Sequence, residues 1–262
     1  MTPFDSWVRH FEANTDRHAA LEADIDWEGY PAIDARTRTA FVRSFRRFEL
    51  GESGDGRHLL AMAAAAGDPV YTKALGLLVL EEQKHSALFG RGLRYLDASS
   101  MDSHWTDAAF TRLRRLLGLR TEIGLLLIAE SVAMGYFDAL AEHAPDPVLR
   151  GIGNRIATDE RNHIRFQIDR LRVGFRHTPA PLRLLVGSAW ALVAAGAATV
   201  LVVDHGTALR ACGIRPTAYW GRAMRSFRAA ARSALAADNV TLLGPTNRTM
   251  QSAPAGVDAP TR

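Results

Sequence analysis

The chain has 262 residues, 47% of them hydrophobic and 23% charged, which is an ordinary globular composition and suits one domain with appended helices. Its single cysteine, Cys212, excludes an internal disulfide framework and a cysteine-ligated cluster, and it fits a reducing cytoplasm. The net charge of +4 is modest for this length and no basic run is interleaved with aromatic residues, so we expect no nucleic-acid partner.

Residues 1–34 are predicted to form a short amphipathic helix followed by a turn-rich arm. We expect the aromatic residues of this segment to pack it onto the rest of the protein; they are Trp7, Phe11, Trp27 and Tyr30. The segment from Met1 to His18 mixes acidic and basic side chains and lacks the apolar centre of a signal peptide, so nothing in it marks export. We therefore expect a cytoplasmic protein.

Residues 35–175 are predicted to form a bundle of four long helices in an all-α protein. Helical periodicity predicts helices from Asp34 to about Gly67, from Asp68 to about Leu96, from about Asp107 to His143, and from Asp146 onward. The second and fourth helices both begin with Asp-Pro-Val, a start signal in which Asp caps the helix and Pro takes its first position. The interval from Asp68 to Asp146 recurs in other pairs of residues.

The same interval relates two Glu-x-x-His motifs. Glu82 and His85 form the first motif, and Glu160 and His163 form the second. Each motif is preceded, at an equal distance, by a further glutamate, Glu52 in the first case and Glu130 in the second. Glu130 ends an apolar run, where an unpaired carboxylate would be costly to bury. The repetition predicts a duplicated helix pair.

Glu and His at this spacing lie on one face of a helix and can reach the same metal ion. The two motifs and their upstream glutamates would supply four carboxylates and two imidazoles, a ligand set that suits iron or manganese better than structural zinc. We therefore predict a site for two metal ions, with Glu52, Glu82, His85, Glu130, Glu160 and His163 as ligands. The alternative is a set of solvated carboxylates and histidines on amphipathic helices.

Neighbouring residues leave several alternatives open. Glu81 and Asp159 precede the ligand glutamates and could each accept a hydrogen bond from the imidazole of the opposite repeat, as partners of metal-bound histidines do. Glu49 is a rival to Glu52, although the equal spacing favours Glu52, and His58 is expected outside the ligand set. Three glycines around Glu52 indicate open space, a local bulge or close helix packing.

Residues 176–238 are predicted to form helices packed on the bundle, and residues 239–262 a disordered tail. Residues 184–203 contain no charge and are long enough to cross a bilayer, but arginines flank both ends and no second span follows. We expect a helix packed against the bundle, walling an apolar cavity beside the metals, and no membrane association. On the next helix the arginines form either a solvated face or a surface for an acidic partner, which would be a carrier protein or anionic lipid.

Residues 81–85, Glu-Glu-Gln-Lys-His, and 159–163, Asp-Glu-Arg-Asn-His, resemble the motifs of the ferritin-like diiron oxidase and oxygenase superfamily. The resemblance covers about residues 35–175 and extends to p-aminobenzoate N-oxygenase-type enzymes and to soluble acyl-carrier-protein desaturases. The N-oxygenase type is expected to have an extra metal-binding histidine where this chain has Ile156. The desaturases are longer than this chain.

The resemblance implies a ferritin-like four-helix bundle with a diiron centre, in which manganese or a mixed pair would fit the same ligands. It implies an oxidoreductase that uses O₂ and an external electron donor to hydroxylate or N-oxygenate a small organic metabolite. Desaturation of an acyl chain on an acyl carrier protein, or oxidation of another lipid, is the alternative. An iron-handling role like that of ferritin or rubrerythrin, or a bundle kept only for partner binding, would not be enzymatic. We further expect a homodimer.

Overall fold

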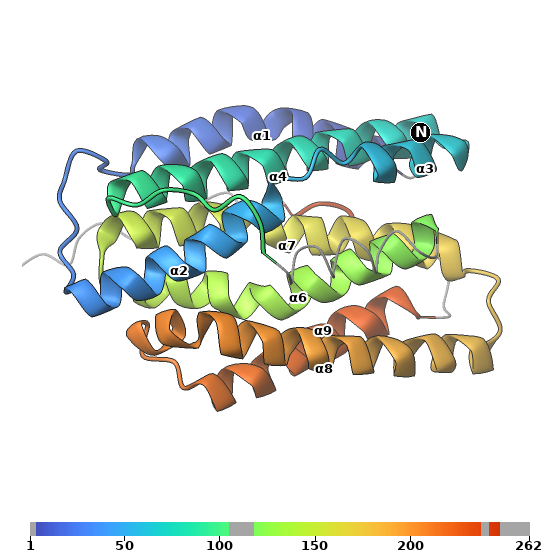
Figure 1. Cartoon of the computed structure of the whole chain (residues 1–262). Helices are drawn as coiled ribbons and strands as arrows, with labels where there is room; N and C mark the ends of the chain where they lie inside the picture. The colour runs from blue at the N-terminus through green and yellow to red at the C-terminus, as the bar shows by residue number, and fades with distance from the viewer. Residues whose placement is uncertain (1–3, 105–117, 237–240, 247–262) are drawn as a thin grey trace, which may run out of the picture.

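The computed structural model describes residues 4–104, 118–236 and 241–246, and this part of the chain contains helices and no strand (Figure 1). The helices are α1 (Asp5–Ala23), α2 (Ala35–Glu52), α3 (Arg57–Ala65), α4 (Pro69–Tyr95), α6 (Leu119–His143), α7 (Pro147–Phe175), α8 (Ala180–Ala211) and α9 (Pro216–Ala234). The prediction of an all-α protein is therefore confirmed.

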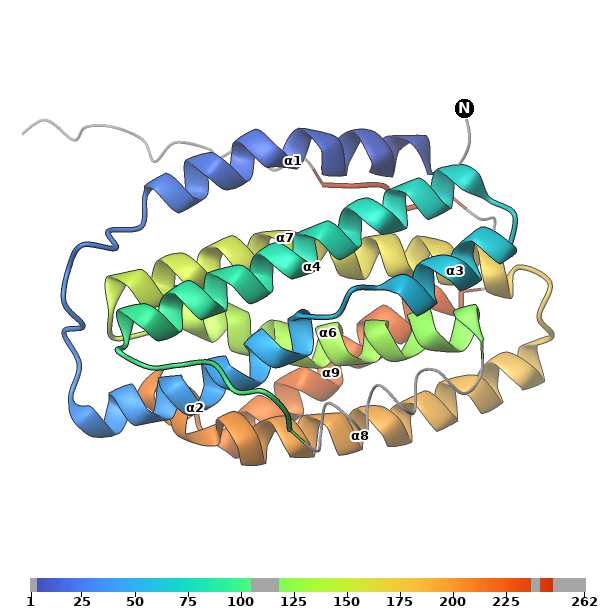
Figure 2. The same cartoon turned by 45° about the horizontal axis from the view of Figure 1, so that its top comes forward.

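The helices form a bundle in which α2, α4, α7 and α6 follow one another around the centre (Figures 1 and 2). The pairs α2 with α4, α4 with α7, and α6 with α7 are in direct contact. Helix α1 packs on α4 and α7, whereas α8 and α9 pack on the opposite side against α6. The central helices are thus covered on two sides.

Three aspartates set where helices of the bundle begin. The side chain of Asp34 accepts hydrogen bonds from the backbone N–H groups of residues 36 and 37 at the start of α2. Asp68 caps α4 and Asp146 caps α7 in the same way, each followed by proline at the first helical position. These caps satisfy N–H groups that have no partner within the helix, so both predicted Asp-Pro start signals are confirmed.

The first predicted helix of the bundle is interrupted, and the prediction of one helix from Asp34 to Gly67 is wrong. Helix α2 ends at Glu52, and α3 begins only at Arg57. Gly56 lies between them with φ of +63°, a left-handed conformation that glycine adopts without steric cost. A Cβ atom at Gly56 would also lie 2.7 Å from Val79 Cγ1. The glycines around Glu52 therefore mark a break in the chain, and Glu52 lies at its edge.

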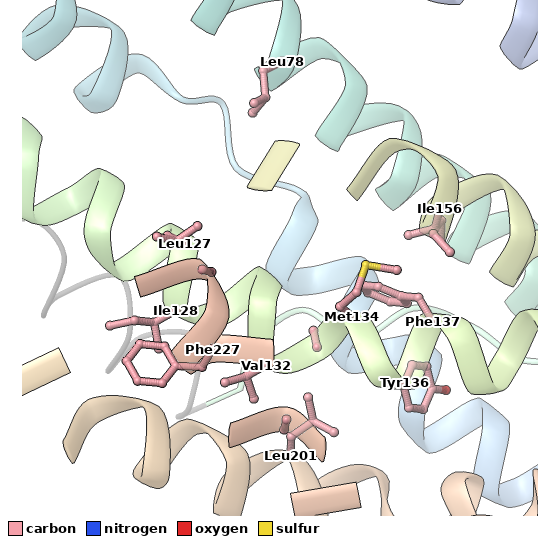
Figure 3. Close-up of a cluster of buried hydrophobic side chains, with 14 of the residues drawn as sticks. Leu78, Leu127, Ile128, Val132, Met134, Tyr136, Phe137, Ile156, Leu201 and Phe227 are labelled. Carbon is pink, nitrogen blue, oxygen red and sulfur yellow. The ribbon is translucent and has the colours of Figure 1, made fainter. Parts of the chain in front are cut away.

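Helix α6 is buried on two sides and joins the bundle to the C-terminal helices. Figure 3 shows its apolar residues between Leu78 and Ile156 on one side and Leu201 and Phe227 on the other. Leu127 and Phe227 are almost fully buried. The predicted start of this helix, near residue 107, lies outside the described residues.

Two of the described helices, α6 and α8, are long and apolar enough to cross a membrane, and they differ in burial. The apolar stretch of α6 is 78% buried inside the protein and that of α8 only 22%. Helix α8 packs against α2, α6 and α9, as expected for a helix on the bundle, but one side of it faces outward. The described part of the chain thus has one apolar helix in the core and one at the surface.

Residues 241–246, which we expected to be disordered, lie along α7. Asp169 accepts hydrogen bonds from the backbone N–H groups of Leu243 and Gly244, and Asn162 accepts one from that of Thr246. The rest of the expected tail, apart from residues 241–246, lies outside the described residues.

Candidate metal centre

The two Glu-x-x-His motifs meet in the middle of the bundle. Glu82 and His85 come from α4, and Glu160 and His163 from α7. Each offers one ligand atom, and these four atoms lie within 4.8 Å of one another. The imidazole rings are 5.5 Å apart, centroid to centroid. The described residues therefore contain a buried group that could hold a metal ion.

The two upstream glutamates flank this group. Glu52 reaches it from the end of α2 and interacts with Glu82, Glu160 and His85. Glu130 reaches it from α6 and interacts with Glu160, Glu82 and His163. Each upstream glutamate thus interacts electrostatically with the histidine of its own repeat. We call the six residues Glu52, Glu82, His85, Glu130, Glu160 and His163 the inner cluster.

Several polar atoms of the inner cluster are buried without a hydrogen-bond partner among the described residues. They are Oε1 of Glu82, Nδ1 of His85, Oε2 of Glu130, Oε2 of Glu160 and Nδ1 of His163. His163 Nδ1 lies only 2.8 Å from Glu82 Oε1, but the two do not meet hydrogen-bond geometry. Buried polar atoms normally have partners, and a shared cation would supply one for all five. Their chemistry, carboxylate oxygen and imidazole nitrogen, fits a metal ion.

The charges of the inner cluster also favour a cation. Burial and the neighbouring charge of Glu82 raise the pKa of Glu52 well above its usual value. Burial and Glu160 do the same to the pKa of Glu130. Burial alone would lower the pKa of His85, but the hydrogen bond to Asp159 and the nearby carboxylate of Glu160 raise it well above the ordinary value. A group of carboxylates this close together is stabilised by positive charge.

The outward-facing nitrogens of the two histidines are held by carboxylates of the opposite repeat. His85 Nε2 donates to Asp159 Oδ2 at 3.1 Å, and His163 Nε2 donates to Glu81 Oε2 at 2.9 Å. Both carboxylates are buried. A hydrogen bond at Nε2 fixes the ring and leaves Nδ1 directed into the inner cluster, which is the geometry of a metal-bound imidazole. We call Glu81 and Asp159 the outer carboxylates.

Helix α1 binds the outer carboxylates from the other side. Asn14 Nδ2 donates to Glu81 Oε1 at 2.8 Å, and His18 Nε2 lies 3.0 Å from Asp159 Oδ1. Neither residue was predicted, because this segment was assigned to packing alone. The signal was a row of polar residues at helical spacing on one face; they are His10, Asn14, His18 and Glu22.

Arg155 and Gln167, both on α7 and both buried, were also missed. Arg155 donates to Asp159 and places its Nε 3.2 Å from Glu22 Oε1, which ties α7 to α1. Gln167 donates to Glu130. No spacing in the sequence distinguishes these two residues from ordinary polar residues on a helix.

Three other residues considered from the sequence lie outside the inner cluster. Glu49 is turned toward Ser100, whose hydroxyl donates to it at 2.6 Å. His58 Nδ1 lies 3.2 Å from Glu122 Oε2, on α6. Ile156 is fully buried in the apolar core.

The inner cluster is closed toward α1 and more open toward the break after α2. His85, Glu160 and His163 are buried, whereas Glu52, Glu82 and Glu130 are half-buried. The side chain of Glu82 is 17% exposed to solvent. A small molecule would therefore meet the carboxylates of α2, α4 and α6 before the histidines.

A depression of about 280 Å³ lies between α6, α7 and α9. Its lining is mainly apolar, with Ser131, Arg165 and Ser226 as polar groups. Met134 and Ile164 also line it, and they lie one helical turn from Glu130 and next to His163, respectively. No α8 residue lines it, so the expectation that α8 walls a cavity beside the metals finds no support here.

Comparison of the chain with protein-family models, curated proteins and solved structures finds no match.

Proposed function

We propose that the protein is a dinuclear metal enzyme, most simply a diiron one, that uses O₂ to oxidise a small organic molecule. The observation that supports this most is the inner cluster itself. Six buried or half-buried ligand groups come from four helices, and five of their polar atoms have no other partner among the described residues. On this proposal, α2, α4, α6 and α7 are the four helices of a ferritin-like bundle.

The positions of the six residues suggest how they would share two ions. Glu52 and His85 would serve one ion and Glu130 and His163 the other, because each glutamate interacts with the histidine of its own repeat. Glu82 and Glu160 each approach both histidines, so their carboxylates would be available as ligands beside both imidazoles. The ligands would be four carboxylates and two imidazoles, as iron and manganese prefer.

Two iron ions held in this way would supply electrons to O₂, which is the chemistry expected of such a centre. The chain's own residues would orient the ligands of this centre and limit the access of water to it. Asp159 and Glu81 hold the imidazoles in one orientation, and α1 and Arg155 fix those carboxylates in turn. Burial toward α1 keeps water from that side, while the half-buried glutamates leave an approach from α2 and α6.

The reaction also needs a source of electrons. Inserting one oxygen atom into a substrate and reducing the other to water uses four electrons, two from the substrate and two from a donor. The sequence has no flavin or iron–sulfur motif, so we propose an external electron donor. The depression between α6, α7 and α9 has a volume and few polar groups that suit a small metabolite, but none of the six inner-cluster residues lines it.

The test is O₂ uptake by protein loaded anaerobically with Fe(II). An enzyme would consume O₂ in one rapid, limited phase and then turn over only when a chemical reductant and a substrate are added. The Glu160→Ala variant should lose the rapid phase. Slow, continuing uptake with growth of a ferric mineral would instead identify an iron-storage protein.

A further inference from the structure

The outward side of α8 is an apolar surface without an assigned role. Its large exposed side chains are Leu182, Leu184, Leu185, Leu192, Val200 and Val203. Leu184 is 73% exposed and Leu192 is 77% exposed. Leu185, Leu192 and Val203 follow one another at close to whole numbers of helical turns, so they lie on one line along the helix. We call this line, with its exposed neighbours, the α8 face.

The α8 face offers few polar groups to a partner, and Thr207, one turn before Arg210, is an exposed hydroxyl residue of this helix. The hydroxyl of Ser188 donates to the carbonyl of Leu184, and that of Thr199 to the carbonyl of Ala195, so both are satisfied within the helix. Asp204 is the one charged residue between Arg183 and Arg210, and it forms an ion pair with Arg47. An interface with another protein would normally present several hydrogen-bonding groups.

Arginines lie at both ends of α8 and on the adjoining helix α9. Residues 176–236 contain eight arginines and one aspartate, a net charge of +7, while the whole chain has +4, so the remaining residues together have −3. Arg210 is exposed and continues the line of Leu192 and Val203, and the adjoining helix α9 exposes Arg225, Arg228 and Arg232. The C-terminal helices therefore carry the excess positive charge of the chain.

The seam between α8 and α9 has the residue expected at a membrane surface. Trp220 is 37% exposed and donates from Nε1 to Thr199 Oγ1 at 3.2 Å. Tryptophan at the edge of an apolar surface, with arginines beyond it, is typical of proteins that lie in the headgroup region.

We propose that α8 and α9 bind the surface of a membrane rich in anionic lipids, with the α8 face in the acyl region and the arginines among the headgroups. Helix α8 would lie along the membrane rather than across it, because its inner side is packed on α2 and α6 and its His205 is buried there. Arginines at both ends of α8 disfavour a helix that crosses the membrane, but they suit one that lies flat.

A second copy of the chain fits this surface less well. In an antiparallel pair of α8 helices, the arginines near one end would meet Arg210 of the other copy, and in a parallel pair like ends would meet. Both arrangements bring positive charges together, which opposes association. Anionic lipid headgroups have the complementary charge.

The test is flotation of the full chain with liposomes, one set of pure phosphatidylcholine and one with an anionic lipid such as phosphatidylglycerol. Wild type should float with the anionic liposomes and remain at the bottom with the neutral ones. The paired substitution Leu185→Glu with Leu192→Glu should reduce the floated fraction at least tenfold. Arg225→Glu with Arg228→Glu should reduce it as well.

The matched control is Leu80→Glu, an exposed leucine on α4, a helix that is not among those packed on α8. It should float like wild type. The proposal is overturned if wild type does not float with anionic liposomes, or if all variants lose flotation equally. It is also overturned if light scattering shows a dimer that becomes monomeric in the Leu185→Glu, Leu192→Glu variant while flotation is absent. Metal content is measured separately for each protein. A failure of the membrane proposal can therefore be distinguished from a failure of the proposed metal centre.

Discussion

The Nε2 atom of His85 lies 3.1 Å from Oδ2 of Asp159, a residue 74 positions later in the chain. The reciprocal contact, from His163 to Glu81, links the same two helices in the opposite direction. Each repeat therefore holds the histidine of the other, and neither half could orient its imidazole alone. This crossed arrangement suggests that the two halves act as one site.

Replacing Asp159 with asparagine should weaken metal binding by about 10- to 100-fold, the usual effect of losing a carboxylate behind a metal-bound histidine. Competition with a chromophoric chelator measures this. Asp159 also pairs with Arg155, so circular dichroism must show that the variant folds. Glu81→Gln should weaken binding in the same way without disturbing that pair, and Asp138→Asn, which pairs with Arg161 on the bundle surface, should not. Unchanged affinity in both Asp159→Asn and Glu81→Gln would contradict the role of the outer carboxylates.

Helix α1 should contribute through the outer carboxylates. Substituting Asn14 and His18 together by alanine leaves Glu81 and Asp159 each without one hydrogen bond, so metal should dissociate several-fold faster. Asp16→Ala, an exposed residue on the same helix, is the control and should dissociate like wild type. Equal dissociation rates for all three proteins would show that α1 only packs on the bundle.

Because the chain breaks after α2, alanine substitutions at two nearby glycines should affect the stability of the protein in opposite ways. Gly56→Ala would force alanine into a left-handed conformation and against Val79, so it should destabilise the protein by about 1–3 kcal/mol. Gly51 lies within α2, and a Cβ atom there would meet nothing within 4 Å. Gly51→Ala should therefore leave stability unchanged or raise it by up to about 1 kcal/mol. Urea unfolding of both variants decides whether the break is a fixed feature of the fold.

A buried polar network near the C-terminal end of α8 predicts that the stability of the protein depends on pH. Ser44 lies 2.6 Å from the Tyr136 hydroxyl and 2.7 Å from His205 Nδ1. Burial, with the charges of Arg47, Arg43 and His104, lowers the pKa of His205 to about 3. His205 is thus neutral in the folded protein but has its ordinary pKa of about 6.5 when unfolded. Its contribution to stability is complete above pH 6.5 and is lost as the pH falls toward 3.

His205→Gln should remove this dependence. At pH 7.5 the variant should be less stable than wild type by about 1–3 kcal/mol, because a buried hydrogen bond is impaired. Between pH 7.5 and 5.0 wild type should lose about 2 kcal/mol more than the variant, at about 1.4 kcal/mol per pH unit below 6.5. The carboxyl groups titrate in both proteins, so their effect cancels in the comparison. The same difference at both pH values would contradict a neutral, buried His205.

Helical periodicity was sufficient to predict the all-α fold, and the repeat predicted that Glu82, His85, Glu160 and His163 come together. The Asp-Pro signals and the constant interval between the two motifs are local patterns, and they fix where α4 and α7 begin and which faces meet. The break at Gly56 was not predicted, because apolar periodicity continues through it and only the contact with Val79 in α4 explains it. Asn14, His18 and Arg155 were missed because their partners lie far away in the sequence. The exposure of α8 depends on which helices cover it, which composition does not specify.

The central claim is tested most directly by counting metal ions. Wild-type protein loaded anaerobically with Fe(II) and freed of excess metal should retain two iron ions per chain. Glu52→Gln should retain less, and Glu49→Gln, one helical turn earlier but turned toward Ser100, should retain the same amount as wild type. If wild type, Glu52→Gln and Glu49→Gln all retain the same substoichiometric amount, the inner cluster is not a metal centre.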